Sequence, residues 1–358
     1  MSRLKSLRGG SITISAHDIE KSMKARPHVV LVGAGATIAA IPYGDKNGKK
    51  SSVMKGFIDS LGLRHLLNGI SLQTTSDNIE DIYSELAASG ENDAVVHELE
   101  NAIREYFSEH EIPDELTVYD FLVLGLTKKD LIASFNWDPL LYQAWSRSHR
   151  ITRNLPQIVF LHGCVALGIC KKDKEVGPIR QCCKICGEPF EQSKLLFPIR
   201  EKHYQDDMYI QNAWKKLDFK LRRAYMFTIF GYSAPKTDEA ALDLLKLSWG
   251  QNTDRKFEEI EIIDIKSPQE LTNTWRDFIF SHHFKATDNL FDSSIGRYPR
   301  RSCEATFERL MNAEFLDAEK GFKIGMSIGE VKTKLSPLIE DEEQHEDDVL
   351  HNPYVYKH

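Results

Sequence analysis

An amide, a carboxylate and an imidazole in the middle third of the chain are the side chains best suited to chemistry. Asn136 and Asp138 stand two residues apart in Ser134–Pro139, and His162 precedes Gly163 directly after an apolar run. A neutral imidazole can accept a proton near physiological pH, while amide and carboxylate groups orient hydroxyl groups or bound water. Each also has an ordinary structural interpretation, since Asp138 could cap a following helix and His162 could be a structural histidine.

Two turns of small residues could bring the backbone close to a phosphate group. The first follows the apolar run Val29–Val32 and consists of Gly33, Ala34, Gly35, Ala36 and Thr37. The second follows another apolar run and includes Gly231 and Ser233. Glycine permits close approach of a ligand, and a helix that starts there presents N–H donors and a favourable dipole. A tight turn with no ligand remains the alternative for each.

Five of the six cysteines fall between Cys164 and Cys186, and only Cys303 stands apart. Cys183 and Cys186 have the C-x-x-C spacing of tetrahedral zinc sites, and we expect Cys170 as a third ligand. A fourth ligand could be Cys164 or Cys182. A metal-free module and reactive thiols are the alternatives.

The elements that must position these residues alternate between apolar strands and periodic helices, which predicts an α/β fold with a Rossmann-like parallel sheet. The expected strands are His28–Val32, Leu131–Phe135, Gln157–Leu161, Met226–Phe230 and Glu259–Ile263. Asp264, after the last of these, could accept hydrogen bonds from ribose hydroxyls. All these polar groups follow strands directly. Because ligands bind at the carboxyl ends of parallel strands, we expect the groups to converge there.

The remaining segments are expected to surround one central domain. We predict an N-terminal arm over 1–27, the main domain over 28–285 and a C-terminal extension over 286–358, with an acidic and most simply solvated tail at about 340–348. A helical insertion is expected at about 52–126. Its clearest helix would bury Val95, Leu99, Ile103 and Phe107, which are spaced four residues apart. A Cys-containing module is expected at about 164–212, and a closing helix at Gln269–His282.

Composition narrows the setting in which these groups work. The 358 residues carry a formal net charge of -7, which argues against a general nucleic-acid binder, and we expect no direct nucleic-acid binding. The apolar runs are too short to span a bilayer, and the basic start of the chain has no following apolar core. We therefore expect a cytoplasmic protein that does not bind membranes.

Taken in order, these pieces resemble the sirtuin family over about two-thirds of the chain, from His28 to Asp264. The first turn resembles the family's glycine–alanine nucleotide turn, and Ile41-Pro42 resembles the isoleucine–proline step after it. Phe135-Asn136-Trp137-Asp138 resembles the family's Gln-Asn-Ile-Asp element, and His162-Gly163 its catalytic His-Gly. Gly231-Tyr232-Ser233 resembles its Gly-Thr-Ser turn.

The resemblance implies that NAD is the substrate and that a small module, often zinc-bearing, follows the His-Gly strand. It implies that Asn136 holds a water near the anomeric carbon of the ribose and that Asp138 contacts the nicotinamide amide. It gives His162 the role of general base on a ribose hydroxyl or on the attacking water. The small-residue turns, Asp45 and Asp264 would contact the rest of the dinucleotide.

Departures from the deacylases favour an NAD hydrolase. Where deacylases pair their peptide with a Phe-Gly-Glu strand, this chain has Leu195–Lys202 with Pro198, which lacks an N–H donor. Phe135 replaces the usual glutamine, and Gly44–Lys50, which contains Asp45, replaces the Asp-Phe-Arg loop. These features resemble the NAD-hydrolysing antiphage-defence branch, which implies a homo-oligomer and a HerA-like ATPase partner. Protein deacylation, ADP-ribosyl transfer and a non-catalytic NAD- or ADP-ribose-sensing scaffold remain alternatives.

Overall fold

The computed structural model describes residues 25–51, 56–90, 92–197, 207–235, 238–250, 255, 257–279, 284–315 and 320–345. Its centre is a six-stranded sheet, parallel throughout, with the strand order β3-β2-β1-β7-β8-β9. In that order the strands are Gln157–Phe160, Leu131–Ser134, His28–Val32, Met226–Phe230, Glu259–Ile263 and Phe284–Thr287. Numbered along the chain this is the order 3-2-1-4-5-6 of the doubly wound Rossmann sheet. The predicted fold class is confirmed.

The inner strands are apolar because helices cover both faces of the sheet. Every residue of Val29–Val32 in β1 is 0% exposed, as expected for a strand buried on both sides. β1, β7 and β8 have the predicted bounds, and β2 and β3 end one residue earlier than predicted. The sequence analysis did not predict β9, whose four residues are all half-buried at the edge of the sheet, and the predicted domain boundary at 285 falls within it.

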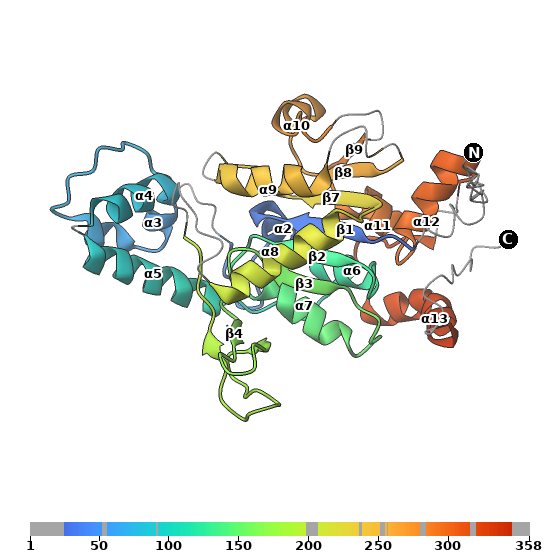
Figure 1. The fold of residues 1–358 in the computed structure, drawn as a ribbon, viewed down its shortest axis with the longest axis horizontal. Coiled ribbons are helices and arrows are strands. Elements are labelled where there is room, and N and C mark those ends of the chain that lie inside the picture. Colours follow the sequence, from blue (N-terminus) through green and yellow to red (C-terminus); the bar gives the residue numbers. More distant parts are fainter. Residues whose placement is uncertain are drawn as a thin grey trace, which may run out of the picture.

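Helices from successive crossovers form two layers around the sheet. α2 (Ala34–Ala40) contacts α6 (Val118–Leu124), and α6 contacts α7 (Leu140–Ser148). α8 (Met208–Leu221) contacts β2, β3 and α9 (Glu239–Trp249), and it crosses in front of the strands in Figure 1. The reversal of strand order between β1 and β7 creates the crevice in which doubly wound sheets bind ligands.

The first part of the predicted helical insertion is a separate bundle at one end of the molecule (Figure 1), whereas α6, which also lies within the predicted 52–126, packs in the core of the sheet. The bundle consists of α3 (Phe57–Ser60), the short 3-10 helix η1 (Leu63–Leu67), α4 (Ile79–Ser89) and α5 (Asp93–Ser108). α5 buries Leu99, Ile103 and Phe107, as predicted from their spacing, whereas Val95 is partly buried against the same core. That core is distinct from the core of the sheet, yet it includes Trp137 and Phe197 from the central domain.

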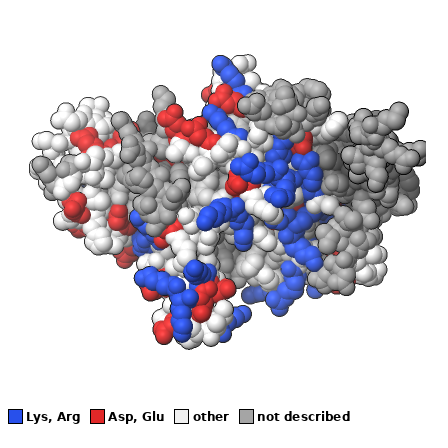
Figure 2. All heavy atoms as spheres, in the orientation of Figure 1, with Lys and Arg blue, Asp and Glu red and all other residues white. Residues whose placement is uncertain are grey.

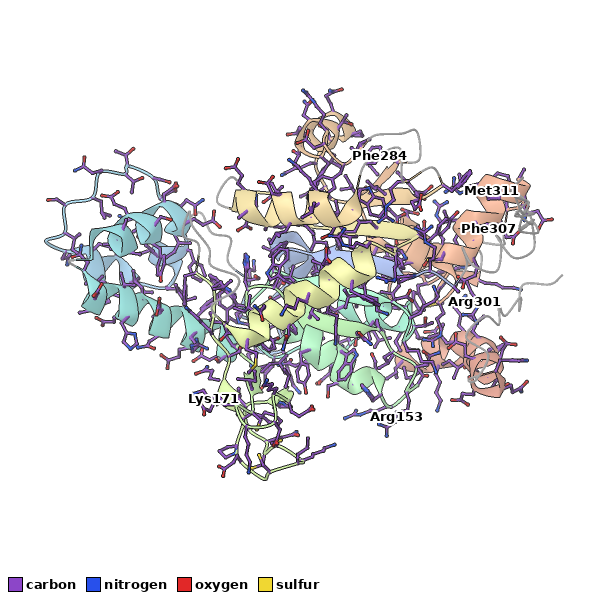
Figure 3. All side chains as sticks on the ribbon, in the orientation of Figure 1. Arg153, Lys171, Phe284, Arg301, Phe307 and Met311 are labelled. Atoms are coloured by element: carbon purple, nitrogen blue, oxygen red, sulfur yellow. The ribbon has the colours of Figure 1, made fainter. Side chains whose placement is uncertain are left out.

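The Cys-containing module projects from the sheet after β3. Its three short antiparallel strands have the order β5-β4-β6 and are Val176–Pro178, Leu167–Ile169 and Glu191–Gln192. Lys171, labelled in Figure 3, lies on this module. Residues 198–206 lie outside the described part, and α8 returns to the central domain at Met208.

The C-terminal region packs against the amino ends of the strands. It contains η4 (Leu290–Asp292), α11 (Ser294–Arg297), α12 (Ser302–Phe307), η5 (Glu308–Asn312) and α13 (Ile328–Gln344). The closing helix predicted for Gln269–His282 is shorter, since α10 is Pro268–Thr274. Trp275 then turns into the core, where it is 1% exposed, and residues 280–283 are not described.

The acidic segment is not simply a solvated tail. Its described part ends α13, where Glu342 is paired with Arg300 and Arg301 of the basic patch that precedes α12. The N-terminal arm up to residue 24 and the tail from 346 onward lie outside the described residues. Within the described part, no helix combines the length and hydropathy needed to cross a membrane.

Candidate active site

The two small-residue turns meet at the point where the strand order reverses. Gly33 N donates to Phe230 O (3.0 Å) and Gly35 N donates to Gly231 O (2.8 Å). Gly231 has a φ of +61°, and a Cβ added there would lie 2.3 Å from Ala36 N. A side chain therefore cannot be accommodated at this position without moving the α2 turn. α2 begins at Ala34, directly after Gly33, so its N-terminus faces the crevice.

Asn136 is held by a hydrogen-bond network that fixes the direction of its amide. Its Nδ2 donates to Gly33 O and to Thr37 Oγ1, each at 2.9 Å. A carbonyl oxygen can only accept, so the amide nitrogen must face inward and the amide oxygen remains to accept a hydrogen bond from a ligand. Thr37 Oγ1 in turn donates to Asp138 Oδ2 (2.8 Å) and contacts Tyr119 Oη (2.7 Å).

Asp138 anchors this network from a buried position. Its Oδ1 accepts from Leu140 N (3.0 Å), the first N–H of α7, although the N-cap residue of that helix is Pro139 and not Asp138 as the capping interpretation requires. Burial raises the pKa of the Asp138 carboxyl, against the opposing effects of the Thr37 hydroxyl and the Leu140 N–H. Burial, with a further contribution from Asp138, raises the pKa of Tyr119 well above its ordinary value. Tyr119 therefore stays protonated and can donate to Thr37.

His162 lies among aromatic rings and a second carboxylate. Its ring centroid is 4.7 Å from that of Phe135, which stacks on Tyr232 at 4.4 Å. His162 Nε2 is 4.0 Å from Asp238 Oδ1, and Tyr232 Oη donates to Asp238 Oδ2 at 3.0 Å. A carboxylate at this distance would stabilise the imidazolium formed when His162 accepts a proton.

Together these groups line a cavity of about 460 Å³ at the carboxyl edge of the sheet. Ten of the predicted site residues line it: Gly33, Ala34, Gly35, Thr37, Asn136, Asp138, His162, Gly231, Ser233 and Asp264. These residues follow the carboxyl ends of five different strands, so the polar groups and the glycine turns converge on one cavity as expected. The volume is in the range of small-molecule sites.

Two predicted cofactor contacts do not line this cavity. Ala36 is fully buried beneath the first turn. Asp45 is 6% exposed, and its carboxylate accepts hydrogen bonds from the backbone N–H groups of Asn47, Lys49 and Glu111. Asp45 therefore fixes its loop to the end of α5.

Other lining residues were not singled out from the sequence. Asp238, which lies beside His162, is one of them. Asn78, Glu80 and Phe107 come from the helical insertion and close one side of the cavity. Their approach depends on how the insertion folds back over the sheet. The one signal that could have found Asp238 is its position after a strand-end turn.

The Cys-containing module holds a compact set of metal-ligating side chains. One ligand atom from each of Cys170, Asp173, Cys183 and Cys186 lies within 4.8 Å of the other three. Cys170 Sγ is 3.4 Å from Cys186 Sγ, and Asp173 Oδ2 is 3.3 Å from Cys183 Sγ. Ligands of tetrahedral zinc are separated by about 3 to 4 Å, so these residues fit a structural zinc ion.

The fourth residue of this set differs from the cysteines considered in the sequence analysis. Cys164 is fully buried and its Sγ donates to Asp138 O, while Cys182 is exposed outside the cluster. Asp173 stands in their place, three residues after Cys170. The module thus has two pairs of candidate ligands with the same spacing, Cys170 with Asp173 and Cys183 with Cys186. The first pair ends in a carboxylate.

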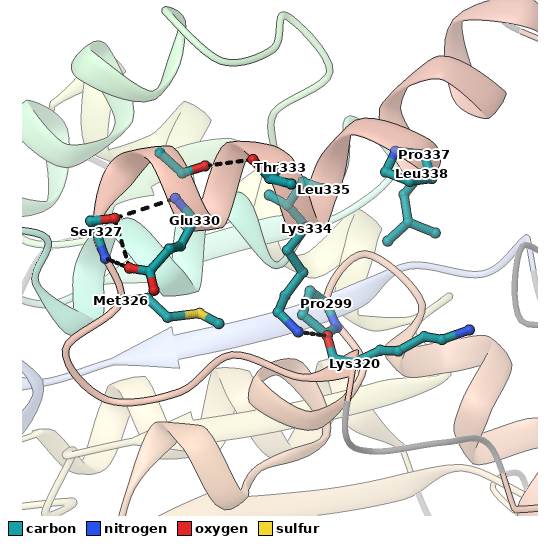
Figure 4. A pocket seen from close by; sticks show the side chains of 11 residues that line it. Pro299, Lys320, Met326, Ser327, Glu330, Thr333, Lys334, Leu335, Pro337 and Leu338 are labelled. Carbon is teal, nitrogen blue, oxygen red and sulfur yellow. Dashed lines mark hydrogen bonds between the residues drawn. The ribbon is translucent and has the colours of Figure 1, made fainter.

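A larger cavity of about 790 Å³ lies beside α13, remote from the strand ends (Figure 4). Its described polar groups are engaged locally, since Ser327 and Glu330 form a capping box and Lys334 Nζ donates to Lys320 O at 2.9 Å. No set of acid, base and amide groups converges among its described lining residues. We therefore place the candidate site in the smaller cavity.

Comparison with known proteins gives a weak structural likeness. No protein-family model and no curated protein matches the chain. The solved structures that resemble it include Sir2 enzymes. A Sir2 homolog–NAD complex is 13% identical with a TM-score of 0.36, and it covers 84% of this chain and 94% of its own. A Sir2 bound to acetylated peptide is 14% identical with a TM-score of 0.37, covering 84% and 99%.

A third Sir2 structure, described as bearing on mechanism and regulation, is 12% identical with a TM-score of 0.38 and covers 90% of this chain. The match covers 96% of the length of that Sir2 structure. Similarity at this level does not assign an activity to the chain. The interpretation of the cavity therefore depends on its own residues.

Proposed function

We propose that the chain is a sirtuin-like NAD+ hydrolase that cleaves the bond between nicotinamide and ribose. The observation that carries this proposal is the convergence of Asn136, Asp138 and His162 with two glycine turns at the crevice of a 3-2-1-4-5-6 sheet. The crevice suits a dinucleotide, because the N-terminus of α2 and the backbone of both turns face the expected position of a pyrophosphate.

The reaction requires water as the acceptor. The C1′–N bond breaks, its electron pair leaves with nicotinamide, and the ribose gains oxocarbenium character. The Asn136 amide oxygen would accept a hydrogen bond from water near C1′. As the water oxygen bonds to C1′, His162 would take its proton, giving ADP-ribose, nicotinamide and a proton released later. Asp138 retains lone pairs that could accept from the nicotinamide amide.

The surroundings of the cavity support water over an acylated peptide. Leu195, Leu196 and Phe197 are 2%, 8% and 7% exposed, and Leu196 N donates to His162 O at 2.9 Å. The Phe197 ring packs against Trp137 at 5.2 Å and stacks on Tyr83 at 5.2 Å. Leu196 N and the Phe197 ring are thus engaged within the protein, which supports the proposal that this segment does not pair with a substrate strand. Pro198–Lys202, the rest of the replaced segment, lie outside the described residues.

We further propose, from the sequence resemblance, that hydrolysis depletes NAD during antiphage defence. In this proposal the chain forms a homo-oligomer in the cytoplasm and works with a HerA-like ATPase partner. The test is co-purification with the product of a neighbouring gene, followed by measurement of mass and NAD turnover. A monomer that hydrolyses NAD alone would contradict the partner and assembly while leaving the chemistry intact.

Incubation with NAD tests the chemistry. We expect ADP-ribose and nicotinamide in equal amounts without any peptide, and at least a hundredfold loss of rate in His162→Ala and in Asn136→Ala. His97→Ala, on the exposed side of α5, should retain full activity. Turnover only with an acetylated peptide would identify a deacylase, and labelling of a target an ADP-ribosyl transferase. Binding without turnover would identify a sensing scaffold.

A further inference from the structure

A band of lysine and arginine side chains covers one side of the molecule, although the whole chain has a net charge of -7. Figure 2 shows blue side chains gathered over α8 and the region beside its C-terminal end. We call this surface the basic face and define it by Lys128, Arg153, Lys215, Lys216, Lys220 and Arg223. Five of these are exposed, and Lys220 is partly buried.

The fold brings these residues together from three separate segments. Lys215 lies on the side of α8 opposite its buried residues, and Lys216 and Lys220 lie between that side and the buried one. Arg223 follows directly after Arg222, the C-cap residue of α8. Lys128 and Arg153 lie in the loops that enter β2 and β3, and Arg153 is labelled at the lower edge in Figure 3.

Hydrogen bonds make the surface continuous. Lys220 Nζ donates to Lys129 O at 2.8 Å, and Lys128 N donates to Asn154 Oδ1 at 2.8 Å. The three segments are therefore adjacent in space. This adjacency has an electrostatic cost. Burial and the nearby charges of Lys129 and Lys216 lower the pKa of Lys220, against the opposing effect of Asp130.

The basic face is at the wrong edge of the sheet to attract the dinucleotide. Parallel strands all enter at one edge, and Lys128, Arg153 and Arg223 precede β2, β3 and β7 at that edge. The cavity lies at the opposite edge, where the described lining has four acidic residues and one basic residue, Lys266. Electrostatic steering of NAD would require positive groups around the cavity instead. The basic face is therefore not placed to attract NAD to the cavity.

One further feature favours a nucleic acid over an acidic protein segment. Phe219 is 54% exposed within the basic face, and the Arg223 guanidinium lies 3.9 Å from its ring centroid. An aromatic ring and a guanidinium plane among positive charges provide a surface on which bases stack while phosphates pair with the cations. Contrary to the expectation drawn from the net charge of the whole chain, we propose that the basic face binds single-stranded nucleic acid through its backbone, without strong sequence preference and at the same time as NAD.

The experiment measures binding of the full chain to a fluorescein-labelled 20-nucleotide single strand by anisotropy at several salt concentrations. Wild-type affinity should fall as salt rises. Lys215→Glu/Lys216→Glu should weaken binding about tenfold or more at low salt and reduce the salt dependence by about two counterions. The matched control Lys323→Glu/Lys332→Glu, with the same charge change on exposed residues near or within α13, should bind like the wild type.

Further measurements and the comparison of the two double variants decide whether the proposal holds. Millimolar NAD should not displace the strand, whereas competition would place the nucleic acid at the cavity and overturn the proposal. Equal losses in both double variants would reduce the effect to net charge and overturn it as well. A synthetic acidic peptide, or a duplex, that binds the basic face while the single strand does not would replace the proposed partner. Melting temperatures establish that the variants fold. None of these readouts depends on NAD hydrolysis.

Discussion

At the scale of single residues, the central feature is how Asn136 is oriented. Two acceptors, Gly33 O and Thr37 Oγ1, take its amide protons, and this leaves only the amide oxygen to meet a ligand. In the hydrogen bonds that connect Tyr119, Thr37 and Asp138, the donor and acceptor of each bond can be assigned from the two end groups. Protonated Tyr119 can donate to Thr37, and the Asp138 carboxylate accepts from it. The sequence contains all four residues but gives no indication that they touch.

Removing the Tyr119 hydroxyl should therefore impair turnover through Asn136. We expect Tyr119→Phe to lower kcat about tenfold with little change in KM, because one hydrogen bond of about 1 kcal/mol that aligns Asn136 is lost. Steady-state NAD hydrolysis measures both constants. The control is Tyr83→Phe, which removes a hydroxyl bonded to Glu100 within the helical insertion. An equal loss of kcat in that variant, or a changed KM alone in Tyr119→Phe, would contradict the positioning role.

His28, at the amino end of β1, predicts a pH dependence of stability. Burial lowers its pKa from 6.5 to about 4, while its ring bonds Ser302 and Thr228 at 2.7 Å each. Above pH 6.5 the residue is neutral in both states and costs nothing. Below pH 6.5 the imidazole of His28 is protonated in the unfolded chain but stays neutral in the folded protein. The free energy of unfolding therefore falls by about 3 kcal/mol by pH 4.

Urea unfolding at pH 7, 6, 5 and 4 checks this expectation. The difference in unfolding free energy between wild type and His28→Gln should shrink as the pH falls, by up to about 3 kcal/mol. His97→Gln, on an exposed site, should parallel the wild type at every pH. A constant difference for His28→Gln would mean that this histidine takes up its proton in the folded state as readily as in the unfolded chain.

At the scale of elements, the Cys-containing module is too small to be stable through burial alone. Its strands have two or three residues each, and Cys182 and Ile185 are exposed. A bound metal would stabilise the folded module, since metal coordination in such modules is coupled to folding.

The neighbouring residues Cys182 and Cys183 give a matched test of that metal. We expect the purified chain to contain about one zinc per molecule by elemental analysis. Cys183→Ser should lose most of it, and Asp173→Ala should lower its affinity, because each removes a ligand of the four-residue cluster. Cys182→Ser should keep the full amount. Zinc retained in Cys183→Ser but lost in Cys182→Ser would mean that the ligand set is different.

At the scale of the whole molecule, an ion-pair network connects α13 to the central domain. Arg300 is 2% exposed, bonds the backbone oxygen of Leu126 and pairs with Glu342. Burial would raise the pKa of Glu342, but Arg300 and Arg301 hold it below its ordinary value. Glu342 thus connects the acidic end of α13 to the central domain, contrary to the expectation of a purely solvated tail, while Glu340 and Glu343 are exposed.

Glu342→Gln should accordingly destabilise the protein by about 3 to 5 kcal/mol at pH 7, since it leaves buried guanidinium groups without their carboxylate. Because the pKa of Glu342 is depressed, its contribution is present above the unfolded value near 4.5 and disappears as the pH falls through the folded value. Chemical denaturation measures the difference. Glu343→Gln, an exposed change one residue later, should have almost no effect. Comparable losses in both variants would argue against the network.

The sequence by itself determined five strands of the central sheet, the long helix of the insertion and the order of the polar groups that follow the strands. These features depend on local periodicity and on residue types such as Gly33 and Gly231, whose backbone requirements can be read directly. Because parallel strands share one carboxyl edge, the convergence of Asn136, His162 and Asp264 also followed from the sequence. The half-buried edge strand β9 and the short strands β4, β5 and β6 of the Cys-containing module were missed because such short segments carry too few residues to establish a period.

Only the tertiary structure decided which side chains meet across segments far apart in the chain. Asp238 lies beside His162, Tyr119 bonds to Thr37, and Asp173 completes the cysteine cluster. The same holds for the basic face, whose members are spread over 96 residues from Lys128 to Arg223. Such contacts arise from the packing of whole elements. Spacing along the chain does not encode that packing, because a helix or loop can present the same residues in many directions until its neighbours fix it.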